Sequence, residues 1–141
     1  MKRWIRITLT VLTSMVGITA IAGGVALVIG AATSSTAGGA VPDSSYLGGS
    51  PFPSYIVPGL VLAVIVGGTH VLAAVLAGRG SPAGPFTAAV AGFGLLIWIF
   101  VQMMFIPFSA LQAIYFAAGL AELGLVLLGL GVVRRDRVAA P

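Results

Sequence analysis

Residues 86–133 read FTAAVAGFGLLIWIFVQMMFIPFSALQAIYFAAGLAELGLVLLGLGVV, which is two long apolar runs separated by a short break at Pro107. Each run has about the 20 residues that an α-helix needs to cross a hydrocarbon core of about 30 Å. Proline ends the first run because it lacks a backbone N–H and clashes with the preceding turn. The pattern S-x-x-Q from Ser109 is a capping box. The stretch therefore predicts two membrane helices, about 86–106 and 110–133, joined as a tight antiparallel hairpin.

Two further apolar runs, about 7–32 and 56–77, precede this hairpin. Residues 33–55 between them are rich in Ser, Thr, Gly and Pro, which indicates a loop. Only helices and closed barrels satisfy backbone groups in lipid, and barrel strands would be about 10 residues long and alternating. We therefore expect an all-α membrane protein, with residues 1–141 forming one domain of four transmembrane helices in an antiparallel bundle.

The composition also limits the classes of function. The chain is 59% hydrophobic and 7% charged, whereas soluble domains have about 25% charged residues. Its partner is therefore the lipid bilayer, and seven basic residues are too few to suggest nucleic acid. The absence of cysteine excludes disulfides and thiolate chemistry. No phosphate-binding loop, dinucleotide fingerprint or H-E-x-x-H motif is present. We expect no enzyme, and no catalytic, cofactor-binding or metal-binding residue.

The basic residues predict the orientation. With four spans, all of them fall on one side of the membrane: Lys2, Arg3, Arg6, Arg79, Arg134, Arg135 and Arg137. The positive-inside rule then places both termini in the cytoplasm and loop 33–55 outside it. Heavy use of Ala, Gly, Val and Arg is typical of a high-GC bacterial genome, so we expect a multi-pass protein of the bacterial cytoplasmic (inner) membrane.

The first span has an alternative interpretation as a cleaved signal peptide. KRWIR resembles the basic region of a signal peptide, and AGGA near residue 40 resembles a cleavage site. However, the apolar run is about 25 residues long, against about 7–15 in signal peptides, which favours a retained helix.

Small or polar side chains follow one face of each predicted helix at three- and four-residue steps. The sets are Thr10, Thr13, Gly17, Ala20 and Gly24; Ala63, Gly67, His70, Ala74 and Ala77; Ala88, Ala91, Leu95, Trp98 and Gln102; and Gln112, Tyr115, Gly119, Glu122 and Gly129. Helices in lipid associate through such residues, so we expect these faces to point into the bundle.

Glu122 is the candidate for chemistry, because no other acid occurs between it and Asp43. At about 1.5 Å per residue it lies about 18 Å from the outer end of its helix, and His70 lies about 21 Å deep in another. A contact between them is therefore expected. It would serve either as an interhelical or subunit contact, which we favour, or as a proton or cation site. A single histidine is a weak metal signal.

Gln102, Gln112 and Tyr115 form a second candidate cluster near the outer ends of the last two helices. A polar vestibule is one interpretation. Helix capping and interfacial placement explain each residue separately and are favoured.

The sequence names no reaction, so two hypotheses about function stand. The first is a small accessory or scaffold subunit of a membrane complex, or a homo-oligomer. Its PFPSY stretch at 51–55 is able to dock on a protein partner, although a linker is the commoner role of such a stretch. The alternative is a minimal proton- or cation-coupled transporter or channel that uses Glu122 and His70.

Overall fold

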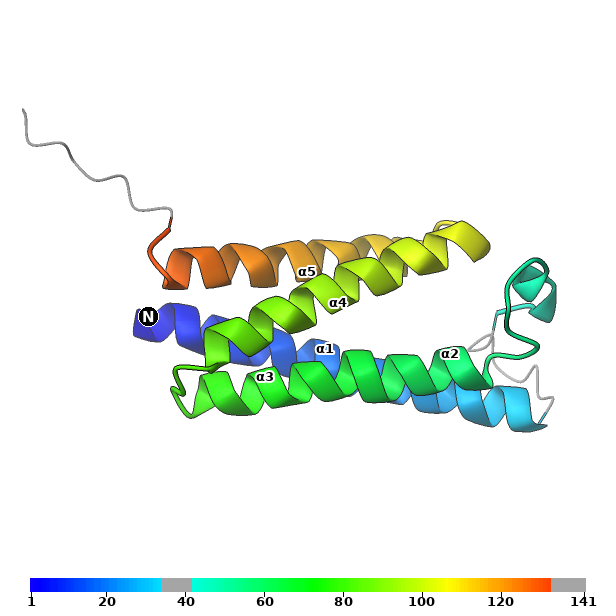
Figure 1. The fold of residues 1–141 in the computed structure, drawn as a ribbon, viewed down its shortest axis with the longest axis horizontal. Helices are drawn as coiled ribbons and strands as arrows, with labels where there is room; N and C mark the ends of the chain where they lie inside the picture. The colour runs from blue at the N-terminus through cyan, green and yellow to red at the C-terminus, as the bar shows by residue number, and fades with distance from the viewer. Residues whose placement is uncertain (34–41, 133–141) are drawn as a thin grey trace, which may run out of the picture.

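The computed structural model describes residues 1–33 and 42–132, and within these ranges the regular structure is entirely helical. Four long helices run antiparallel to their chain neighbours (Figure 1). They are α1 (Arg3–Thr33), the second span Ile56–Gly78, α4 (Gly84–Phe105) and α5 (Ala110–Gly129). Each is long and apolar enough to cross a membrane. The prediction of four long apolar helices in an antiparallel arrangement is therefore confirmed.

The hairpin of α4 and α5 forms as its sequence predicts. Pro85 lies in the first turn of α4, where its missing N–H is not needed. At the start of α5 the Ser109 hydroxyl accepts the Gln112 N–H, and the Gln112 side chain accepts the Ser109 N–H. The predicted capping box is therefore confirmed.

The predicted end of the last helix was wrong. We expected it near Val133, but α5 ends at Gly129. Gly131 follows with a φ of 75°, and the Val132 N–H donates back to the Leu127 carbonyl. This left-handed glycine with its backward hydrogen bond is a common way to stop a helix, and it overrides the apolar character of the residues that follow.

The second span is not one uniform α-helix. It consists of α2 (Ile56–Leu60), a π-helical segment η2 (Val61–Gly67) and α3 (Gly68–Gly78). This part packs backbone against backbone on α1. A Cβ added at Gly59 would lie 2.7 Å from the Gly24 carbonyl oxygen, and one at Gly67 would lie 2.6 Å from Ile21. The wide π turns accompany this close approach, and such segments are frequent at functional sites.

The bundle is closed at one end and spread at the other. α1 packs against α3 and α5, and α4 packs against α3 and α5. From its start beside α3, α4 diverges from the second span toward the other end, where residues 42–55 fold over the bundle (Figure 1). A short 3₁₀ helix, η1 (Ser44–Leu47), lies in this loop.

The inward faces are those that the spacing predicts. Two apolar clusters form the core: Leu9, Ala73, Ala77, Ala88, Ala91 and Val126, and then Val16, Ala20, Val66, Leu95 and Ile99. Most residues of the four predicted stripes are buried, and the others are half-buried. Small residues thus line the helix contacts, while larger aliphatic and aromatic side chains cover the outside.

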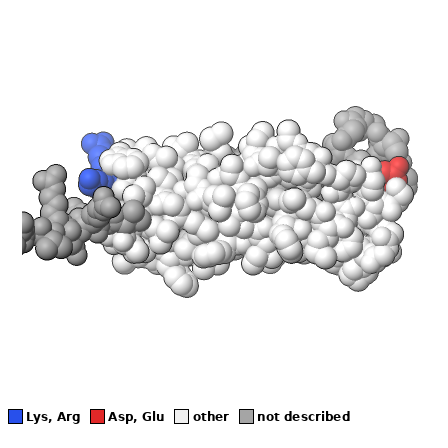
Figure 2. Space-filling model, turned by 90° about the horizontal axis from the view of Figure 1, so that it is seen from above, with Lys and Arg blue, Asp and Glu red and all other residues white. Residues whose placement is uncertain are grey.

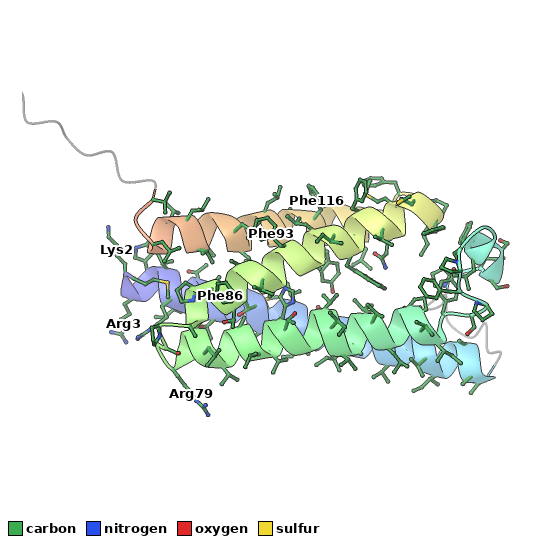
Figure 3. All side chains as sticks on the ribbon, in the orientation of Figure 1. Lys2, Arg3, Arg79, Phe86, Phe93 and Phe116 are labelled. Atoms are coloured by element: carbon green, nitrogen blue, oxygen red, sulfur yellow. The ribbon has the colours of Figure 1, made fainter. Side chains whose placement is uncertain are left out.

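The exposed charged residues gather at the two ends of the bundle (Figure 2). Lys2, Arg3 and Arg79 project at the end where α3 turns into α4 (Figure 3), which we call the basic end. Asp43 lies in the loop at the opposite end, which we call the loop end. Arg134, Arg135 and Arg137 lie outside the described residues.

Candidate functional site

His70 and Glu122 meet in the middle of the bundle. The imidazole Nε2 lies 3.2 Å from the carboxyl Oε2, and both side chains are 0% exposed. His70 belongs to α3 and Glu122 to α5, two helices that each pack mainly against α1 and α4. The pair therefore links helices across the bundle rather than along one packed seam.

The hydrogen bonds of His70 determine how many protons the pair holds. The imidazole Nδ1 lies 2.6 Å from the Val66 carbonyl oxygen in η2. A carbonyl oxygen only accepts, so Nδ1 carries a hydrogen. The second contact then needs one shared proton: either a neutral Glu122 donates to Nε2, or a charged imidazole donates to a carboxylate. In both states the pair is electrically neutral overall, which suits a buried position.

The backbones of α4 and α5 enclose the carboxyl group. A Cβ added at Gly92 would lie 3.3 Å from Glu122 Oε2, and one at Gly119 would lie 3.3 Å from the Gly92 carbonyl oxygen. Within the described part of the chain, Oε1 of Glu122 is a buried side-chain oxygen with no hydrogen-bond partner. Leaving such an atom unpaired costs about 1–3 kcal/mol.

Two cavities lie nearer the loop end, and neither His70 nor Glu122 lines either of them. The larger, of about 560 Å³, lies between the second span and α4 and is covered by the loop. The smaller, of about 160 Å³, lies between α1, α4 and α5. Gln102, Gln112 and Tyr115 all line the smaller cavity. The structure thus brings these three residues together, but apart from His70 and Glu122.

Trp98 lines both cavities together with Gln102. We did not predict it as a site residue from the sequence. The two side chains are four residues apart on α4, so they share one face of that helix. That spacing was visible in the sequence as part of the stripe. What it could not indicate was that α4 diverges from the second span and leaves space beside these residues.

A hydrogen bond joins the two ends of loop 42–55. The Tyr55 hydroxyl donates to the Asp43 carbonyl at 2.9 Å. Burial and then the Asp43 charge raise the pKa of Tyr55. Asp43 itself accepts the Ser45 N–H, and this bond lowers the pKa of the Asp43 carboxyl. These contacts hold Phe52 and Leu47 at the wall of the larger cavity.

Among the described residues, no group of three His, Cys, Asp or Glu side chains is close enough to hold a metal ion. Comparison of the chain with protein-family models, with curated proteins and with solved structures found no match.

Proposed function

We propose that this chain is a small multi-pass membrane protein that acts as an accessory or scaffold subunit, joined either to a protein partner or to a second copy. The observation that supports this proposal is the enclosure of the His70–Glu122 pair. A conducting site needs a route for ions or protons to reach it. Here the pair is fully buried and lines neither cavity. Its geometry fits a contact that holds helices in register.

The outer surface offers a contact for such a partner. Phe86, Phe93 and Phe100 recur every seven residues along α4 and are 71%, 57% and 65% exposed; the first two are labelled in Figure 3. A seven-residue repeat stays on one face of a helix that supercoils with a neighbour. We propose that this phenyl row contacts a transmembrane helix of the partner.

Co-purification tests the proposal. The C-terminus is tagged, the protein is extracted in a mild detergent, and co-purifying chains are identified by mass spectrometry with their stoichiometry. We expect one partner, or a second copy, at a fixed ratio. Phe93→Ala should weaken the association, whereas Ile114→Ala, at a position of α5 that is 64% exposed, should not. A protein that purifies alone as a monomer and conducts ions would refute the accessory role.

We further propose that the basic end faces the cytoplasm of a bacterial cell, with loop 33–55 outside. The positive-inside rule supports this orientation, and the described basic side chains share one end of the bundle (Figure 2). The chain has no cysteine, so in the variant Ser45→Cys a thiol reagent labels this protein at position 45 alone. An impermeant maleimide should label Ser45→Cys in intact cells. Labelling only after the cells are lysed would reverse the orientation.

Proton or cation coupling is the second candidate function, and one observation favours it. Glu122 Oε1 lacks a partner among the described residues, so loss of the shared proton would leave a carboxylate able to take another cation. We expect a pH-dependent flux in proteoliposomes that Glu122→Gln abolishes if this candidate holds. An unchanged flux in that variant would eliminate it.

A further inference from the structure

The larger cavity has the depth of one membrane leaflet. Along α4 its lining runs from Phe105 to Gly94, eleven residue steps that span about 16 Å at 1.5 Å per residue. This length is close to half the thickness of a hydrocarbon core of about 30 Å, which is the thickness of one leaflet. Its volume of about 560 Å³ lies within the roughly 300–1,000 Å³ typical of small-molecule sites. Ile65 and Ile97 on its wall are 57% and 63% exposed, so it is open toward the surrounding lipid.

The shape of this cavity indicates which occupant fits. A partner helix that spans the membrane would have to leave through the loop end. There, however, Leu47, Phe52 and Tyr55 of the loop form part of the cavity wall, and the loop lies over the end of the bundle (Figure 1). Apart from Ser50, Tyr55 and Gln102, the lining is apolar or glycine. One flexible hydrocarbon chain fits such a cleft, whereas a continuous helix does not.

The smaller cavity supplies the polar end of the same site. It shares Trp98 and Gln102 with the larger one. The carboxamide oxygen of Gln112 already accepts the Ser109 N–H, so its NH₂ group is left to donate. Gln102 and Tyr115 line the same cavity, and their amide and hydroxyl groups can also donate. Polar groups at this depth lose free energy when unpaired, and a ligand with acceptor oxygens would pair them.

The charge distribution defines the head group further. The labelled basic side chains Lys2, Arg3 and Arg79 project at the opposite end of the bundle (Figure 3). An anionic head at the smaller cavity would therefore have no described counter-charge near it, and its desolvation would be costly. An uncharged head with carbonyl, ester or hydroxyl oxygens matches the donors that are present.

We propose that the loop end binds a single-chain, uncharged membrane amphiphile, with its tail in the larger cavity and its oxygen-bearing head against Gln102, Gln112 and Tyr115. Trp98 lies between the two parts and contacts the junction of head and tail. The site is independent of the accessory role, because it uses neither the phenyl row nor the His70–Glu122 pair.

Fluorescence quenching by a brominated lipid tests this site. The chain has two tryptophans, so Trp4→Phe leaves Trp98 as the only one. The probe is monooleoylglycerol with a dibrominated chain, titrated into the purified Trp4→Phe protein in dodecyl maltoside micelles. We expect saturable quenching of Trp98. Quenching that rises linearly without saturation would mean partition into the micelle only and would overturn the proposal.

Glycines provide a matched pair of variants. A Cβ added at Gly94 or at Gly124 meets no atom within 4 Å, so either site accepts a side chain without a direct clash. Only Gly94 lines the larger cavity. In the Trp4→Phe background, Gly94→Phe should abolish the saturable quenching and Gly94→Leu should weaken it, whereas Gly124→Phe should leave it intact. Equal quenching in Gly94→Phe and Gly124→Phe would refute the tail site, and circular dichroism checks that each variant is folded.

Two comparisons test the head. Gln102→Leu and Tyr115→Phe should each raise the Kd of the brominated probe about three- to tenfold, the effect of losing one neutral hydrogen bond. The ionised dibrominated oleate anion should bind more weakly than the uncharged ester. An unchanged Kd in both variants, or equal affinity for the anion, would refute the polar part of the site.

Discussion

Substitutions of Glu122 distinguish the two protonation states of the buried pair, because they remove different parts of the contact. In one state a neutral Glu122 donates to His70, and in the other a charged imidazole donates to the carboxylate. Glu122→Gln keeps a donor: its NH₂ group can donate to Nε2 of a neutral His70 whose Nδ1–H is held by the Val66 carbonyl. Glu122→Leu removes the donor and leaves Nε2 buried without a partner. The first variant should therefore be close to wild type in stability, and the second should not.

The expected magnitudes follow from the geometry. An unpaired buried polar atom costs about 1–3 kcal/mol, which is the expected loss in Glu122→Leu. This loss is partly offset because Oε1 of Glu122, which has no partner among the described residues, is removed as well. The distance of 3.2 Å is longer than the roughly 2.7–2.9 Å of charge-assisted bonds. Interhelical hydrogen bonds in membranes contribute about 0.6 kcal/mol on average and about 1.7 at most. We therefore expect a coupling energy near 1 kcal/mol.

The assay is a double-mutant cycle in mixed micelles of dodecyl maltoside and sodium dodecyl sulfate. The free energy of unfolding is measured from far-ultraviolet circular dichroism for wild type, Glu122→Leu, His70→Leu and the double variant. The double variant should be more stable than the sum of the single losses predicts, since it leaves no buried partner unpaired. Glu122→Gln is measured beside them. If Glu122→Gln were as destabilised as Glu122→Leu, the shared proton would reside on the imidazole, as a charged pair with the carboxylate, and not on a neutral Glu122.

Three further predictions concern the rest of the bundle. Gly24→Leu should destabilise the protein by about 1–3 kcal/mol or more, because an added Cβ overlaps the backbone of the second span. Gly68→Leu is the control and should have little effect, because a Cβ added there meets no atom within 4 Å. Thermal unfolding by circular dichroism compares the two variants, and equal melting temperatures would contradict the close packing of α1. Ser109→Ala should cost about 1 kcal/mol by removing the capping box of α5; an unchanged free energy of unfolding would show that the cap contributes nothing. The lowered pKa of Asp43 predicts that its contribution to loop order is present above its ordinary pKa of 3.8 and is lost as the pH falls through the lower folded value. Protection of the Ser45 amide against hydrogen exchange, measured relative to its intrinsic exchange rate at each pH, should therefore fall in that acidic range in wild type. A similar fall in Asp43→Asn would contradict this cause.

The sequence predicted the helices well because their causes are local. Apolar length, Pro107 and the S-x-x-Q pattern depend only on residues near each other in the chain, and the hairpin of α4 and α5 forms as they indicate. The inward faces were also predictable, since three- and four-residue spacing places small residues on one side of a helix. The end of α5 was predicted too late, because apolarity was counted and the left-handed turn at Gly131 was not.

The candidate site was predictable only in part. Similar depth on two inward faces indicated that His70 and Glu122 could meet, and they lie 3.2 Å apart. The partner of Nδ1 could not be predicted, since it depends on the Val66 carbonyl in a π-helical segment. The role of Gln102, Gln112 and Tyr115 as the lining of one cavity was likewise raised only as one of two interpretations.

By itself, then, the sequence determined that the chain forms four apolar helices, where most of them begin and end, and which face of each is buried. These properties follow from hydropathy, capping and periodicity, which act within one helix. Only the tertiary structure decided that α1 and the second span pack closely through Gly24 and Gly59 while α4 diverges from them. Helix crossing depends on contacts between residues far apart in the chain, and this divergence creates the cavities beside Trp98 and Gln102.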